Sequence, residues 1–212
     1  YSVSNQIEHL KEAFVFSFTH TTVRWLLLFF LVLSFPMFAF ATLMSQPYLI
    51  SRGFEITSLG FIFGFIHGVS GALSALSHIV EQRIGEKRSL LLITGLYVAI
   101  FVLAGLVMNQ WVAFALIILL YLVTNYKGIL LSTYLNHHVR SENRATVLSI
   151  RSFINNVVIT LLVVVIGRLI DLYSIDAVLI GLGVLMGAIS APFLIRRYTT
   201  RFKRVMEASS EA

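Results

Sequence analysis

Two long stretches of the chain carry no formal charge, and a short charged segment separates them. Residues 56–80 contain no Asp, Glu, Lys or Arg, and after Arg88 the next charged residue is Lys127. Residues 81–88 between them hold five charges. A helix needs about 20 apolar residues to cross a bilayer, so each stretch is long enough for a crossing. The segment 81–88 is therefore predicted to turn at one membrane face.

The composition agrees with a membrane protein. Hydrophobic residues make up 58% of the chain, charged residues only 12%, and the mean hydropathy is +0.87. In a soluble protein the net charge of +6 would suggest nucleic acid. Here the basic residues alternate with apolar stretches and act as topology signals, so we exclude nucleic acid as a partner. The absence of cysteine removes disulfides and thiol chemistry.

We predict an all-α membrane domain of six transmembrane helices over residues 25–195. Residues 1–24 are predicted to form a cytoplasmic linker or a surface-lying amphipathic helix, and residues 196–212 a basic cytoplasmic tail. Pro36 should kink the first span because it lacks a backbone donor, and residues 46–48 are expected to mark its exit. The six predicted spans are 25–49, 56–80, 89–107, 111–133, 144–167 and 177–195.

The distribution of Lys and Arg predicts the orientation. If both termini lie on the cytoplasmic side, 14 of the 16 basic residues fall on or near that side, and only Arg52 and Arg168 fall on the other. Short cytoplasmic loops are enriched in Lys and Arg. Both termini are therefore expected in the cytoplasm.

The second predicted span carries small residues along one stripe. Gly60, Gly64 and Gly68 recur every four residues and so lie on one side of a helix. Small residues let helices approach closely in a membrane. We expect this stripe to pack against another helix.

Several polar residues within the predicted spans are candidates for a solute or proton path, because polar groups are expensive in a bilayer. His67 lies near the middle of the second span. It could carry a proton, although we favour a neutral imidazole hydrogen-bonded to a neighbouring helix. Asn125 and Lys127 lie in the inner half of the fourth span. We favour a Lys127 side chain that extends to the membrane face; inside a cavity it would attract an anionic solute.

The fifth span carries two adjacent asparagines at a similar depth, Asn155 and Asn156. Neighbouring residues on a helix point about 100° apart, so at most one should face a cavity, and the other should bond to a neighbouring helix. Arg151, one turn away, is expected to face the loop or a lipid phosphate.

Two enzyme interpretations carry little weight. Residues 68–71 match the G-x-S-G pattern of intramembrane serine proteases, but no histidine lies on the sixth span to act as base. The second interpretation is a haem or metal site. His67 and His78 share a helix face, yet no opposing histidine pair exists on another span to complete such a site. We expect no enzyme activity, no metal and no cofactor.

Three segments together resemble the C-terminal six-helix half of a major facilitator superfamily transporter of bacterial type. Residues 78–88 are similar to its cytoplasmic loop motif G-x-L-x-D-R-x-G-[RK]-[RK], where Arg83, Gly85 and Lys87 match. His78, Gln82 and Glu86 depart from that motif. Residues 144–150 resemble the opening of the family's eleventh helix, and residues 46–60 its seventh-to-eighth-helix connection.

The resemblance implies two inverted three-helix repeats and a missing N-terminal half that would rock against this one. Within each half, the first and fourth helices mainly line the cavity, with the second and fifth beside them. The implied function is secondary active transport of a small solute, by symport or antiport and coupled to protons, in the bacterial inner membrane. The alternative is a six-helix scaffold or binding subunit that transports nothing.

Overall fold

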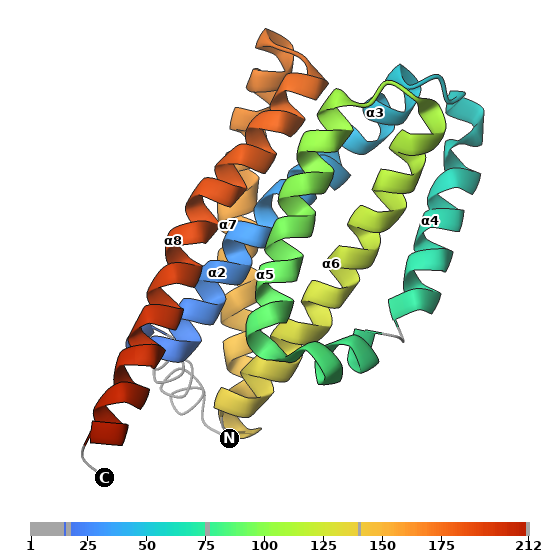
Figure 1. Cartoon of the computed structure of the whole chain (residues 1–212). Coiled ribbons are helices and arrows are strands. Elements are labelled where there is room, and N and C mark those ends of the chain that lie inside the picture. Colours follow the sequence, from blue (N-terminus) through green and yellow to red (C-terminus); the bar gives the residue numbers. More distant parts are fainter. Residues whose placement is uncertain (1–14, 16–17, 75–76, 140, 211–212) are drawn as a thin grey trace, which may run out of the picture.

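The computed structural model describes residues 15, 18–74, 77–139 and 141–210, and the regular elements in these ranges are all helices (Figure 1). Six helical segments are long and apolar enough to cross a membrane, which confirms the predicted all-helical, multi-pass character. These segments are Thr21–Ser51, Ile56–Leu73, Arg88–Leu106, Gln110–Leu135, Arg144–Leu172 and Ile175–Ile195.

The first span is continuous but changes its helical type. It consists of α2 (Thr21–Ala39), the π-helix η1 (Phe40–Met44) and α3 (Ser45–Ser51). The predicted exit at residues 46–48 is wrong, because the helix continues to Ser51. Pro47 lies in the first turn of α3, where a missing backbone donor is tolerated. The chain leaves the helix at Gly53, whose φ of 93° suits glycine.

The second span begins with a short 3₁₀-helix, η2 (Ile56–Ser58), which leads into α4 (Leu59–Ser74). The predicted end at residue 80 lies in the following helix, and residues 75–76 between the two fall outside the described residues. The next helix, α5 (Ser77–Leu106), is broken at Gly85, where φ is 75° and ψ is 167°. The expected turn 81–88 is therefore helical on both sides of one glycine. Only glycine adopts such a backbone conformation readily.

The last three spans are single long helices: α6 (Gln110–His138), α7 (Ser141–Leu172) and α8 (Ile175–Ser210). Asn109 caps α6, because its Oδ1 accepts hydrogen bonds from the Trp111 and Val112 amides at 3.0 and 3.1 Å. Helix α8 runs beyond the predicted end of the last span into the basic tail. Most of the predicted linker or amphipathic helix, residues 1–14 and 16–17, lies outside the described residues.

Helices α5 and α8 pack extensively against each other and form one side of the bundle (Figure 1). Helix α2 contacts α6, α7 and α8, and α6 also contacts α4 and α5. Figure 1 shows α4 at the edge beside α6 and α7 behind α2, with the start of α2 and the end of α8 at the same end of the bundle. Helices α4 and α7 are the least covered: 17% and 11% of their spans are buried, against 39–50% for the others.

Glycines bring α5 and α8 into close contact. A Cβ atom on Gly105 would lie 2.6 Å from the Asp176 carbonyl oxygen, and one on Gly183 would lie 3.0 Å from Val102. The predicted packing stripe on α4 makes no such close contact. A Cβ on Gly60, Gly64 or Gly68 would meet nothing within 4 Å. No described part of the chain lies against that stripe, so its packing role stays a prediction for a partner outside this chain.

An ion pair joins α8 to the end of α3. The buried Arg52 guanidinium pairs with the Asp176 carboxylate and lies 4.7 Å from the centre of the Tyr48 ring. The Tyr48 hydroxyl donates to the Ala104 carbonyl of α5 at 2.8 Å. Burial lowers the pKa of Arg52, but its hydrogen bonds to Asp176 and Tyr48 offset this and leave the pKa raised. Arg52 therefore stays charged and holds three helices together.

Replacing Gly105 with Ala is expected to destabilise the bundle. The new methyl group would clash with backbone at the α5–α8 contact, so the free energy of unfolding should fall by about 1–3 kcal/mol. The matched change Gly64→Ala enters open space and should be neutral or slightly stabilising, because alanine favours helix over glycine. Thermal unfolding in detergent compares the two. Equal melting temperatures would contradict the tight contact.

Candidate functional site

Lys127 is an ionisable residue buried between three helices. The side chain extends from α6 and is 6% exposed. Its Nζ donates to the Ser34 hydroxyl of α2 at 2.9 Å and lies 5.6 Å from the centre of the Tyr97 ring of α5. The expectation that Lys127 extends to the membrane face is therefore wrong. The ammonium group instead points across the bundle, because α2 and α5 pack against α6 at this level.

The groups around Lys127 are held in place by further hydrogen bonds. The Ser34 hydroxyl donates to the Phe30 carbonyl at 2.7 Å. The Tyr97 hydroxyl donates to Thr124 at 2.9 Å, and Thr124 in turn donates to the Leu120 carbonyl at 2.7 Å. Ser34 and Tyr97 therefore present fixed faces to the ammonium group. A lysine has three N–H donors, so Ser34 satisfies only one of them.

Ser34 also lines a small cavity of about 30 Å³ between α2 and α7. Arg24 contributes from α2, and Arg151 and Asn155 contribute from α7; the remaining lining is apolar. Lys127 does not line this cavity itself, but its bond to Ser34 connects it to the same place as Arg151. Arg151 was expected to face the loop or lipid, but it lines the cavity instead. Space of this size holds about two waters or one small polar group.

This cluster is rich in donors and positive charge. Among the described residues, no carboxylate pairs with Lys127 or Arg151, and Arg151 makes no hydrogen bond. An unpaired charge inside a bilayer costs several kcal/mol. Such a site favours an anionic group, which would satisfy the unused donors and reduce the repulsion between the cations.

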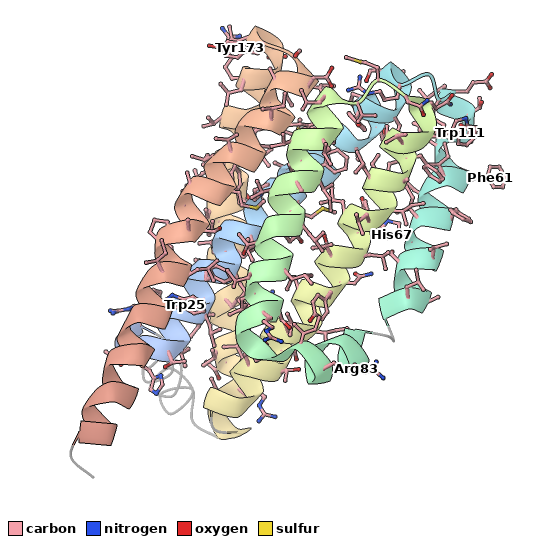
Figure 2. The ribbon with its side chains drawn as sticks, viewed as in Figure 1. Trp25, Phe61, His67, Arg83, Trp111 and Tyr173 are labelled. Carbon is pink, nitrogen blue, oxygen red and sulfur yellow. The ribbon has the colours of Figure 1, made fainter. Side chains whose placement is uncertain are left out.

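His67 does not make the expected hydrogen bond to a neighbouring helix. Its side chain is exposed, and the ring meets the Tyr121 ring of α6 edge-on with centroids 4.9 Å apart. Figure 2 places His67 on the side of α4 towards α6, whereas Phe61 points away from the bundle. At 100° per residue His67 lies between the α6-facing side and the glycine stripe. It thus borders the open face of α4.

The predicted asparagines divide between the cavity and an open face. Asn155 lines the cavity, whereas Asn156 is exposed and Asn125 is half-buried. Within the described chain, none of these side chains, nor that of His67, forms a hydrogen bond to another helix. The expectation that one asparagine bonds to a neighbouring helix is therefore wrong for Asn156.

Polar and small residues continue along the same open faces of α6 and α7. They recur at steps of three and four residues and so form one stripe on each helix. On α6 the stripe is Tyr121, Asn125, Gly128 and Ser132, and on α7 it is Ser149, Ser152, Asn156 and Thr160. The members of the α7 stripe are all exposed. Lipid is a poor environment for such a face.

The remaining predicted residues and a second cavity lie apart from this cluster. Arg83 is exposed at the end of the bundle (Figure 2), Gly85 forms the break in α5, and the side chain of Lys87 lies outside the described residues. A cavity of about 540 Å³ between α7 and α8 is lined almost wholly by apolar side chains such as Val165 and Leu185. It offers no charged group to bind a polar solute.

Comparisons with known proteins add no identification. No protein-family model and no curated protein matches this chain. Among the described residues, no group of three or more His, Asp or Glu side chains could hold a metal ion. The function must therefore be argued from the arrangement of residues itself.

Sequence reasoning missed the partners of Lys127 and undervalued Arg151. Ser34 and Tyr97 lie on the first and third spans, far from Lys127 in the sequence, and nothing local marks them. A usable signal existed for Arg151 and Asn155, which are four residues apart and so share a helix face. That this face lies against α2 follows only from the packing of the helices.

Replacing Lys127 with Met should stabilise the fold. The change removes a buried charge but keeps a similar length, and Ser34 keeps its bond to Phe30, so the free energy of unfolding should rise by about 1–3 kcal/mol. Thermal unfolding of the full-length protein measures this. Arg168→Met serves as the control, because Arg168 is exposed on α7. A lower melting temperature for Lys127→Met would mean that a carboxylate elsewhere in the protein pairs with Lys127.

Proposed function

We propose that this chain is the C-terminal half of a secondary transporter of the major facilitator type, which moves a small solute by alternating access. The observation that carries the proposal is the set of open, polar or small-residue faces on α4, α6 and α7. Helices that met only lipid would present apolar faces there. A second six-helix half would cover these faces and enclose a polar path between the two halves.

The packing pattern supports two inverted three-helix repeats. The second span packs on the fourth and the fifth on the first; the third contacts the fourth and the sixth contacts the first. Exchanging the first three spans with the last three leaves this set of contacts unchanged. Consecutive spans run in opposite directions, so the two sets are inverted relative to each other. Such repeats are typical of this transporter class.

The alternative of a non-transporting scaffold predicts that polar residues are satisfied in pairs between helices. His67, Asn125 and Asn156 instead lack side-chain hydrogen bonds to other helices within the described chain. The exposure of His67 and Asn156 favours a water-filled path over a static bundle. We assign no enzyme activity to the chain. We propose the bacterial inner membrane from the resemblance to bacterial members of this family, and both termini in the cytoplasm from the distribution of Lys and Arg.

Single cysteines test whether the α7 stripe lines a water-filled path. This chain contains no cysteine of its own, so a full-length protein without other cysteines can carry one at a time. We expect Ser152→Cys and Asn156→Cys to react with a membrane-impermeant thiol reagent at least ten times faster than Leu161→Cys. Leu161 is also exposed on the same helix but lies off the stripe. Equal, slow labelling at all three positions would argue against a path.

Proton coupling is the second part of the proposal, and His67 is the candidate proton carrier. It lies near the middle of α4, at the border of the open face of that helix. In sealed vesicles with an imposed pH gradient, His67→Ala is expected to lose most gradient-driven accumulation of solute by the full-length protein.

The matched control is Ser70→Ala, because the Ser70 hydroxyl bonds only to the backbone of its own helix and should not affect coupling. Unchanged coupling in His67→Ala would remove His67 from the mechanism. Absence of transport across a broad solute panel would instead favour the scaffold.

A further inference from the structure

The donor-rich cluster around Lys127 indicates which class of solute this protein takes. We propose that the cluster of Ser34, Lys127, Arg151 and Asn155 binds an oxyanion group, such as a carboxylate or a phosphate, of a small water-soluble solute. This inference rests on the proposed transport function and adds the chemistry of the substrate.

The first argument is the charge balance. Lys127 is 6% exposed, and Arg151 is half-buried one helix away. Neither has a carboxylate partner among the described residues. Lys127 bonds to Ser34 on the cavity wall and Arg151 lines the same cavity, so two like charges there would repel each other. An incoming negative charge offsets this repulsion, whereas a neutral solute leaves it unchanged and a cation increases it.

The second argument is the set of hydrogen-bond donors. Lys127 uses one of its three N–H groups on Ser34, and the Arg151 guanidinium uses none within the described chain. The Asn155 amide adds further donors on the same side of α7 as Arg151. Carboxylate and phosphate oxygens accept several such bonds at once. The adjoining space of about 30 Å³ fits one such group and not a whole solute.

The third argument is the location. The cluster joins α2, α6 and α7, and the walls of the cavity belong to α2 and α7. The two helices carry Ser34 on one wall and Arg151 with Asn155 on the other. An anion between them would pull the two walls together. Binding would therefore act on two helices of this half and favour the arrangement in which they lie close together.

Direct binding to the full-length protein tests the inference. The probes are inorganic phosphate and lactate, with lactamide as a neutral analogue of the same shape, added to protein purified in neutral detergent. Phosphate or lactate is expected to raise the midpoint of thermal unfolding in a concentration-dependent way, and lactamide is expected to have no effect. A shift with lactamide equal to that with lactate would overturn the proposal.

Variants locate the site. Each shift is measured against the variant's own baseline, because Lys127→Met is itself expected to change stability. Lys127→Met and Arg151→Gln should each weaken anion binding at least tenfold. Arg168→Gln removes a cation from the exposed side of the same helix and should bind normally. Anion binding that survives both cluster variants would place the site elsewhere and overturn the assignment.

A lipid phosphate has the same chemistry, so a second arm separates the two sources. The protein is placed in phosphatidylcholine vesicles with and without phosphatidylglycerol. A stabilisation that depends on Lys127 and occurs only with phosphatidylglycerol, with no response to phosphate or lactate, would identify a lipid site and overturn the soluble solute.

Transport in vesicles separates failure of this inference from failure of the proposed function. Transport of a neutral or cationic solute that is unaffected by Lys127→Met would overturn the anion site and leave the transporter intact. Lys127-dependent binding of phosphate or lactate without movement of any probe would support the anion site and reject transport.

Discussion

The hydrocarbon core offers no water to the backbone, and the rest of this structure follows from that constraint. Each span must satisfy its own amide and carbonyl groups, so each becomes a helix. Side chains have no such internal solution, and a polar side chain inside the bilayer needs a partner or water. Lys127 is buried with one hydrogen bond, while the α7 stripe is left open. Lys127 and the α7 stripe therefore mark where water, a solute or another protein segment would supply the missing hydrogen-bond partners.

The two sides of the bundle differ in a way that suits a moving half. On one side, Gly105 and Gly183 bring α5 and α8 into close contact, and the Arg52 ion pair to Asp176 ties α3 to α8. On the other, α4 and α7 are each held mainly by one neighbour and leave their polar faces uncovered. In the proposed transporter, the tight side would move as one body, and the open side would contact the second half.

The charged cluster lies where these two parts meet. Lys127 reaches from α6 to Ser34 on α2, while Arg151 and Asn155 approach the same place from α7. In the proposed transporter, an anion bound there would connect α2, α6 and α7. Its binding would then favour one arrangement of these helices over another. His67 lies on α4, beside Tyr121 of α6. This places a group that can carry a proton on a neighbouring helix.

The sequence by itself determined that the chain is helical, that it has six spans, and roughly where they lie, because apolar length is a local property. It also identified Lys127 and Asn155 as polar groups that need a reason. It could not determine that Lys127 points inward or that Arg151 lines the cavity. Nor could it show that the close glycine contacts are made by Gly105 and Gly183, and not by the regular stripe on α4. These depend on which helix faces which, and that is decided by packing between spans far apart in the chain. The ends of spans were misplaced by several residues for a related reason, since a proline in a first turn or one glycine with positive φ decides whether a helix continues or breaks.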